Sequence, residues 1–135
     1  MEYKVVLFIV LIALALYFYD KNKHNKKSSK VFEGRESLTN QEFYNLYFKK
    51  NNTPEYIVIG VKEILEEQLG ESLEKLSAED DFSKNINFFF ERDSMADVEI
   101  VICLENKFNI AIEDSEAVET HTVRDIVNLV WQKLK

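Results

Sequence analysis

The amino-acid sequence predicts an all-α protein, in which a small four-helix bundle (three main helices and one short helix) is preceded by a single transmembrane helix. Only three Gly and one Pro occur among the 135 residues, so residues that break helices are scarce. Apolar residues recur at helical spacing through the C-terminal part of the chain. An unbroken apolar run near the start supplies the transmembrane segment.

Residues 1–20 are predicted to form a membrane anchor. Val5–Tyr19 is entirely apolar or aromatic, and this run nears the roughly 20 residues that span a bilayer. A cleaved signal peptide is the alternative, but it would need a more basic start and a small-x-small site without bulky residues behind it. The aromatic end of the run is instead typical of a membrane interface. We therefore expect membrane contact through Val5–Tyr19.

The distribution of lysines predicts the orientation of the anchor. Five lysines fall within Asp20–Lys30, whereas the segment before the apolar run contains Lys4. Because positive charge is retained on the cytoplasmic side, the sequence predicts a single-pass protein of the cytoplasmic membrane with its C-terminal domain in the cytoplasm. The same lysines are also suited to contact anionic lipid head groups.

Residues 21–52 are predicted to form a linker that contains a short aromatic helix. The segment from Lys21 to Glu36 is polar and has no apolar periodicity, which predicts a mobile chain. Thr39-x-x-Glu42 then resembles a capping box. The aromatic residues that follow share one helical face: Phe43, Tyr44, Tyr47 and Phe48. This helix is expected to pack on the following domain or to lie in the membrane interface, with packing favoured.

Residues 53–135 are predicted to form the helical domain. Thr53 as N-cap and Pro54 at the first helical position begin its first helix, which Gly70 ends. The connection from Glu71 to Arg92 is expected to insert apolar side chains into the core: Leu73, Leu76, Phe82, Ile86 and Phe88 to Phe90.

Three further helices are expected after this connection. The second main helix begins at Asp93 or Ser94, and its predicted buried stripe comprises Met95, Val98, Val101, Leu104 and Phe108. A short helix is expected near Asp114–Glu119. Thr122 then caps the last helix, whose predicted inward residues are Val123, Ile126, Val127, Val130, Trp131 and Leu134.

Charge and composition exclude several classes of function. Residues 53–135 carry eight Lys or Arg against nineteen Asp or Glu, so this part is strongly acidic and unsuited to nucleic acid. Such a surface suits a basic protein partner. The single cysteine, Cys103, excludes an internal disulfide and a cysteine-clustered metal site, and it is expected to be a small core residue. His24 and His121 have no paired nucleophile or base, so no catalytic residues and no metal site are predicted.

The segment Asp93-Ser94-Met95-Ala96-Asp97 places a serine in the first turn of a predicted helix. Taken alone, this pattern favours an ordinary N-cap, which is a common role for Ser and Asp. The surrounding sequence supports a different interpretation. From Tyr56 to Leu134 the chain resembles the acyl carrier protein family, whose attachment motif is Asp-Ser-Leu followed by an acidic helix. The residues that carry the resemblance are Asp93-Ser94-Met95, Val98-Glu99-Ile100, Leu104-Glu105, Phe108, Ile112, Ala117 and Thr122-Val123, together with the helix Val61 to Gly70.

This resemblance implies a carrier, not an enzyme. A phosphopantetheinyl transferase would attach 4'-phosphopantetheine to Ser94, beside Asp93, and the thiol of that arm would hold acyl groups as thioesters for delivery to acyl-transferring enzymes. The negatively charged phosphodiester would suit a helix N-terminus. The residues expected to contact basic docking patches of partner enzymes are Met95, Asp97, Glu99, Ile102 and Glu105. Ile102 could equally be a core residue.

The chain also departs from the family pattern beside the motif. Glu91 stands where the family usually has Gly, Ala96 replaces a frequent acidic residue, and the loop from Phe82 to Ser94 is longer and carries three consecutive Phe. The alternative function is therefore an unmodified membrane adaptor that keeps the fold and docks a basic partner through its acidic second helix. An anchor is itself unusual in this family, whose members are mostly soluble.

Overall fold

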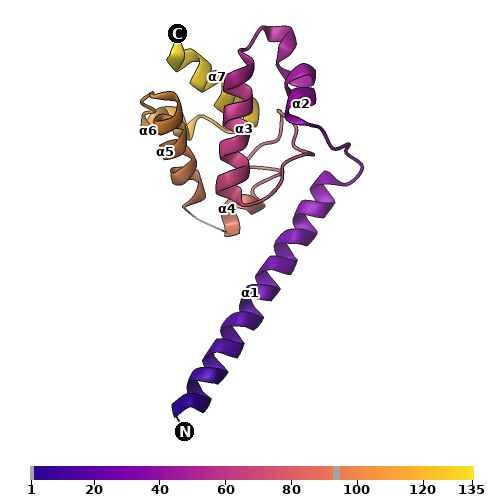
Figure 1. Cartoon of the computed structure of the whole chain (residues 1–135), viewed down its shortest axis with the longest axis vertical. Coiled ribbons are helices and arrows are strands. Elements are labelled where there is room, and N and C mark those ends of the chain that lie inside the picture. Colours follow the sequence, from indigo (N-terminus) through magenta and orange to yellow (C-terminus); the bar gives the residue numbers. More distant parts are fainter. Residues whose placement is uncertain (1, 93–94) are drawn as a thin grey trace.

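The computed structural model describes residues 2–92 and 95–135. Every regular element within these residues is a helix, so the predicted all-α fold class is confirmed. An isolated β-bridge joins Asp81 to Thr122. In chain order the helices are α1 (Glu2–Phe32), α2 (Asn40–Tyr47), the short 3₁₀ helix η1 (Lys49–Asn51), α3 (Glu55–Leu69), α4 (Phe88–Arg92), α5 (Ala96–Phe108), α6 (Asp114–Val118) and α7 (Val123–Leu134) (Figure 1).

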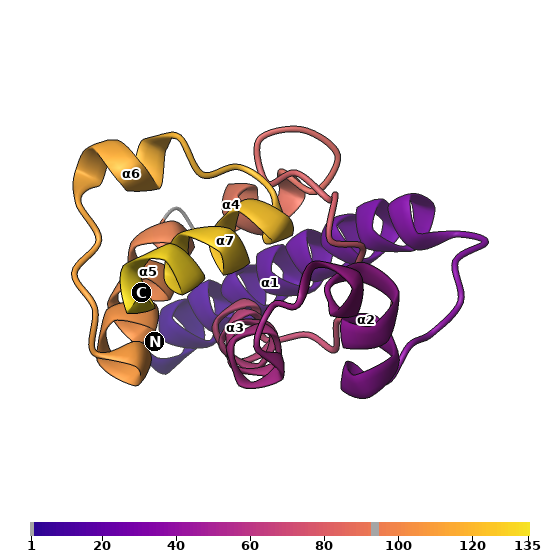
Figure 2. The ribbon, with the colours of Figure 1, turned by 90° about the horizontal axis from the view of Figure 1, so that it is seen from above.

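Helix α3 lies at the centre of the bundle and packs against α2, α5 and α7 (Figure 2). Its apolar residues Ile57, Val61 and Leu65 are fully buried. Gly60 permits the close approach of α5, because a Cβ atom at this position would lie 2.8 Å from the Cζ atom of Phe108. Gly70 ends the helix in a left-handed conformation (φ 68°), as the sequence predicts.

Helix α1 continues well past the predicted anchor. The sequence predicts a mobile segment from Lys21 to Glu36 and no helix there, whereas the chain remains helical to Phe32. Lysine is a good helix former, which allows a polar continuation. The end of the helix also packs on the domain, since Phe32 is buried and Val31 lies against the core. Contact with the domain therefore stabilises the helical conformation of this segment, although its sequence has no apolar periodicity.

Helix α2 packs on the following domain, which is the favoured one of its two predicted locations. Its capping box is present, with the Thr39 side chain accepting from the amide of Glu42 and the Glu42 carboxylate accepting from the amide of Thr39. Phe43 and Phe48 are fully buried. The buried Lys62 of α3 places its ammonium group 4.8 Å from the centre of the Phe43 ring, and burial lowers the pKa of this lysine. Packing on the domain, the favoured alternative, is thus confirmed.

The start of α3 differs by one residue from the prediction. Pro54 occupies the N-cap position, and the predicted N-cap Thr53 is buried with its hydroxyl oxygen making no hydrogen bond. The backbone carbonyl of Thr53 instead accepts a hydrogen bond of 2.8 Å from the Tyr44 hydroxyl of α2. The threonine is held by this packing between α2 and α3 and does not cap the helix.

The connection between α3 and α4 inserts apolar side chains into the core, as predicted. Leu73, Leu76, Phe82 and Ile86 are buried along it. At its end the chain forms α4, a helix of five residues that the sequence analysis does not predict. Phe88 and Phe89 of α4 are buried with ring centres 4.5 Å apart, and Phe90 stacks on Phe82 at 5.0 Å. The aromatic run thus fixes α4 against the bundle.

The buried face of α5 is rotated from the predicted stripe. The predicted helix start at Asp93 or Ser94 lies outside the described residues, and the described helix begins at Ala96. Ala96, Ile100 and Leu104 are buried, whereas Met95 and Val98 are about half exposed, so the prediction is wrong for these two. Most residues from Val98 to Leu104 are apolar, so spacing alone could not distinguish between the possible faces.

The last two helices follow the prediction closely. Helix α6 occupies the expected position, and Thr122 caps α7 in a capping box with Asp125. The inward residues Val123, Ile126, Val127 and Val130 are buried. Leu134 is the exception, because it lies in the final turn of α7 at the rim of an open surface pocket and is 38% exposed.

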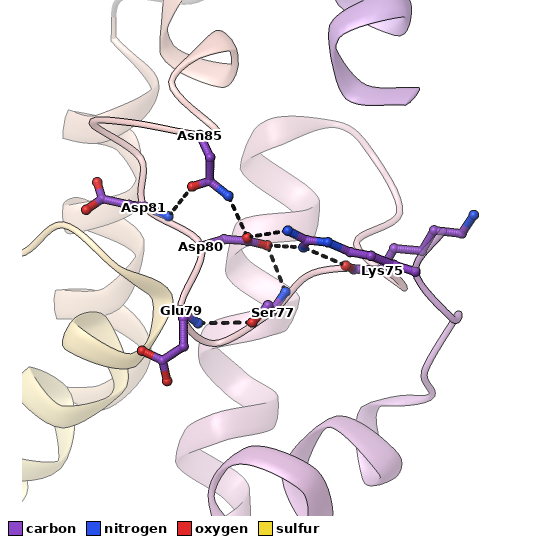
Figure 3. A network of polar contacts seen from close by, with 7 residues as sticks. Lys75, Ser77, Glu79, Asp80, Asp81 and Asn85 are labelled. Carbon is purple, nitrogen blue, oxygen red and sulfur yellow. Dashed lines mark hydrogen bonds and ion pairs between the residues drawn. The ribbon is translucent and has the colours of Figure 1, made fainter. Parts of the chain in front are cut away.

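A buried carboxylate ties the end of α1 to the connection between α3 and α4. Asp80 is 2% exposed and accepts hydrogen bonds from both terminal nitrogens of Arg35, at 2.8 and 3.0 Å. The amide of Ser77 and the side-chain amide of Asn85 also donate to it, each at 2.8 Å (Figure 3). Arg35 further donates to the carbonyl of Lys75 at 3.2 Å. Four donors therefore offset the cost of burying this charge.

We expect the substitution Asp80→Asn to lower the free energy of unfolding by about 3 kcal/mol, because it leaves the Arg35 charge unpaired and turns an amide N–H₂ toward other donors. Urea unfolding of the full chain in detergent, followed by the fluorescence of Trp131, measures this change. This tryptophan packs against the core and is the only one in the sequence.

The matched control is Glu63→Gln, which removes the partner of Lys107 from an ion pair of 3.1 Å whose side chains are both exposed. Exposed pairs contribute little, so we expect a change below about 0.5 kcal/mol. Equal effects of the two substitutions would contradict a special role for Asp80.

Candidate functional site

The candidate attachment residues Asp93 and Ser94 lie outside the described residues, between α4 and α5. The structure does describe both flanks. Arg92 ends α4, and Met95 is the N-cap residue of α5, with its side chain 54% exposed. The connection between these helices is therefore short, and its C-terminal flank is accessible to a large partner.

The two flanking helices are held in place independently of the connection. Helix α4 is fixed by the buried rings of Phe88 and Phe89. Helix α5 is fixed by Ala96, Ile100 and Leu104, which face the core. The connection is consequently attached at both ends to helices that are fixed in the bundle. A flexible group attached within such a connection would start from a defined position on the domain.

The outer face of α5 combines apolar and acidic side chains. Met95, Val98 and Ile102 recur at spacings of three and four residues and are each at least 45% exposed. Asp97 and Glu99 are exposed beside them. Of the two alternatives for Ile102, the core residue is therefore excluded.

Glu105 has a different environment from the other predicted contact residues. It is half-buried, and its carboxylate accepts a hydrogen bond of 3.1 Å from the amide of Ile112. This contact stabilises the turn between α5 and α6, where Asn109 adopts a left-handed conformation. The structure thus gives Glu105 a role within the fold, while Met95, Asp97, Glu99 and Ile102 remain available on the surface.

A cavity of about 360 Å³ opens between α5, α6 and α7. Helix α5 contributes Asp97 and Val98, the third and fourth residues after Ser94. The rest of the lining is mostly apolar and comes from further along α5, from Phe82 and α4, and from α6, α7 and their connections: Phe82, Phe90, Ile100, Val101, Leu104, Ile112, Asp114, Ala117, Val118, Thr120, Ile126 and Leu129. An apolar cavity that begins within one helical turn of the candidate serine is suited to an apolar group carried there.

Sequence reasoning missed this cavity. It identified several lining residues only as core positions, and it assigned no role to Val118, Thr120 or Leu129. The one available signal was Val118, an apolar residue in a short polar helix, which is 73% exposed. The cavity depends on how far α6 stands from α5 and α7, and no local pattern encodes that spacing.

The remaining chemistry-bearing residues form no second site. Within residues 2–92 and 95–135, no group of three or more His, Cys, Asp or Glu side chains could hold a metal ion. Cys103 is half-buried against the core, in line with its expected packing role. His121 is exposed, and its backbone amide donates to Asp125 near the start of α7.

Comparison with known proteins agrees with this geometry. Residues 60–130 match the family model described as "Phosphopantetheine attachment site", which spans the candidate serine and the cavity. An acyl carrier protein of an Exiguobacterium species is 37% identical over 82 residues, which cover 61% of this chain and 99% of that protein.

Two further acyl carrier proteins show similar agreement. The one from Cyanidium caldarium is 34% identical over 82 residues (61% of this chain and 91% of that protein). The one from Wolinella succinogenes is 39% identical over 70 residues (52% of this chain and 87% of that protein). The helical bundle, the flanked serine, the apolar cavity and these matches lead to one conclusion: the chain belongs to the acyl carrier protein family, and it is a carrier that takes a covalent 4'-phosphopantetheine and not an enzyme.

Proposed function

We propose that the chain is a membrane-tethered acyl carrier that bears its 4'-phosphopantetheine on Ser94 and delivers acyl groups to partner enzymes. The observation that carries this proposal is the position of Ser94 in a short connection between two fixed helices, with an apolar cavity beginning at Asp97 and Val98 of α5. Within the family-matching region, the segment Asp93-Ser94-Met95 is the one that corresponds to the family's attachment motif.

The described residues fit the cofactor. Met95 and Asp97 are exposed, so the carrier domain itself does not cover the segment after Ser94. Helix α5 has 13 residues, and the first amides of such a helix favour an anion such as a phosphodiester. The acidic side chains of Asp97 and Glu99 are in solvent, where their repulsion of that anion is screened. The bound group supplies a thiol that carries acyl groups as thioesters.

The cavity supports a role in protecting the acyl chain. Its lining residues include Val101, Ala117 and Leu129, which offer an apolar alternative to water for a chain attached nearby. Each methylene group that leaves water gains about 0.8 kcal/mol. We therefore propose that a medium-length acyl chain enters this cavity between transfers.

The membrane tether rests on α1. Glu2–Lys23 is apolar and long enough to cross a bilayer, and none of it packs against the rest of the described chain. Lysines 21, 23, 26, 27 and 30 lie at the C-terminal end of this segment and directly after it, which supports a cytoplasmic position for the carrier domain. Coenzyme A and the transferase that uses it are in that compartment.

The partner-binding face comprises Met95, Asp97, Glu99 and Ile102 on α5. Carriers of this family work with a phosphopantetheinyl transferase and with acyl-transferring enzymes. The exposed carboxylates suit basic patches on such enzymes, and the apolar side chains add contact area. Weak, charge-steered docking suits a carrier that must leave each partner after transfer.

The substitution Ser94→Ala tests the attachment site. Full-length protein co-expressed with a broad-specificity phosphopantetheinyl transferase should gain the mass of one phosphopantetheinyl group, and Ser94→Ala should abolish the gain completely because no hydroxyl remains there. Ser115→Ala, which removes an exposed serine of α6, should still gain the full mass. Intact-mass spectrometry reads all three proteins, and an unmodified wild type would favour the adaptor function instead.

The substitution Ala117→Phe tests the acyl cavity. A phenyl ring should occupy room for about three methylene groups and remove about 2 kcal/mol of stabilisation from a bound chain. Calorimetry of carrier loaded with an octanoyl group should therefore show a smaller rise in melting temperature over the unloaded carrier than the wild type shows. The unloaded variant serves as its own control for folding. An undiminished rise would mean that the chain lies elsewhere.

A further inference from the structure

Helix α1 and the segment just after it contact the carrier domain directly, and we call this interface the dock. Three sets of contacts hold α1 against the domain. The Lys27 ammonium lies 2.5 Å from the Glu91 carboxylate of α4 and lowers the pKa of that glutamate. The Phe32 ring meets the Phe88 ring of α4 edge-on at 6.5 Å, and beyond the end of α1 the Arg35 guanidinium pairs with Asp80.

The contacts with α4 act close to the attachment site. Glu91 is three residues before Ser94, and Phe88 is six residues before it. Both positions belong to the part of the chain that departs from the family pattern, since Glu91 stands where the family usually has Gly and Phe88 opens the triple Phe run. The residues that distinguish this carrier beside its motif are therefore the ones that attach α4 to the membrane helix.

The dock turns the attachment end of the domain toward the membrane. In Figure 1, α4 and the first turn of α5 lie at the end of the domain that faces the N-terminal half of α1, and the C-terminus of α7 lies at the opposite end. Figure 2, which looks down from above, shows α1 running beneath the domain. Met95 is the N-cap residue of α5 at this end, so an arm on the preceding residue, Ser94, would start from the membrane-facing end.

The height of that end above the bilayer follows from helix geometry. The apolar run of α1 ends at Tyr19, and the contact with Glu91 is made at Lys27. Eight residues of helix rise about 12 Å, and the 13 residues from Tyr19 to Phe32 rise about 20 Å, whereas a small folded domain is about 30 Å across. A soluble enzyme therefore cannot fit between the docked carrier and the lipid surface.

We propose that the docked carrier exchanges acyl groups with an enzyme embedded in the membrane, whose active site lies at the cytoplasmic surface and whose acyl acceptor or donor is itself a lipid. This proposal rests on the proposed function, since it takes the tether and the Ser94 arm as given. A membrane enzyme that projects little above the bilayer fits the gap of about 12 to 20 Å. The exposed apolar stripe Met95, Val98 and Ile102 begins at the same end and supplies contact area for it.

The same geometry makes release of the dock a condition for soluble partners. The transferase that modifies Ser94 is larger than the gap, so it must act while α4 is free of α1. A soluble enzyme should therefore react slowly with the docked form on a membrane and faster when the dock is broken.

Fluorescence energy transfer to labelled lipid head groups tests the orientation. The full chain, with Cys103→Ser, is reconstituted in vesicles of phosphatidylcholine and phosphatidylglycerol and labelled at Met95→Cys or at Lys135→Cys. The domain separates these positions by a distance on the order of its own diameter, so we expect at least about twofold more transfer from position 95. Equal transfer from both positions would show a freely tumbling domain and overturn the proposal.

A second measurement tests whether the dock limits the access of a soluble transferase to Ser94. The double variant Phe32→Ala, Glu91→Lys removes two sets of contacts and places a like charge beside Lys27. In vesicles, a soluble transferase should modify this variant at least about fivefold faster than the wild type, because the wild type must first undergo a conformational change. In detergent the two should react at similar rates, and Trp131 fluorescence should confirm that the variant is folded.

The possible results distinguish a failure of the membrane-facing dock from a failure of the proposed carrier function. Equal rates for wild type and variant in vesicles would overturn the membrane-facing dock while leaving the carrier function intact. No modification of either protein in detergent or in vesicles would instead contradict Ser94 as the attachment site. Failure of the protein to float with vesicles in a density gradient would contradict the tether.

Discussion

The ion pair between Arg35 and the buried Asp80 is the constraint on which the rest of the structure depends. A carboxylate that is 2% exposed would be very costly without partners, and its four donors come from three residues: Arg35 after α1, and Ser77 and Asn85 in the connection between α3 and α4. These donors thus belong to two segments, the one after α1 and the connection between α3 and α4, and the network orders a connection that has little regular structure. That connection carries Phe82 and Ile86 into the core and leads into α4.

The attachment site inherits its position from this network through α4. The rings of Phe88 and Phe89 fix α4 on the bundle, while Lys27 and Phe32 fix it on α1. Ser94 follows within two residues of the end of α4. A carrier needs a mobile arm, and the segment from which we propose that the arm starts follows α4, which packs on α1. With α1 in the membrane, as proposed, only enzymes at the membrane surface would meet the arm without prior rearrangement.

The contacts at the centre of the bundle are separate from the contacts between α1 and α4. Helix α3 contacts α5 through the approach of Phe108 to Gly60, and it contacts α2 through Lys62 and Phe43. Neither contact involves α1 or α4. One set of residues thus builds the bundle that holds the cavity and the α5 face, and another set fixes that bundle against α1.

The sequence by itself determined the elements that local chemistry encodes. Helical periodicity and scarce Gly and Pro gave the all-α class, the capping boxes at Thr39 and Thr122 marked the starts of α2 and α7, and Gly70 marked the end of α3. The residues around Ser94 resemble the family's attachment motif by their types and spacing alone. These features depend on residues within a few positions of each other, which is why a linear reading finds them.

Tertiary structure alone decided where the elements meet. The polar segment 21–32 is helical because its end packs on the domain, and Thr53 accepts through its carbonyl because α2 lies beside it. In α5, where most residues from Val98 to Leu104 are apolar, the neighbouring helices selected Ile100 over Met95 and Val98 for burial. The cavity and the dock of α1 on α4 join residues up to 64 positions apart. Such contacts depend on the distance between packed helices, a quantity that no local spacing of residue types contains.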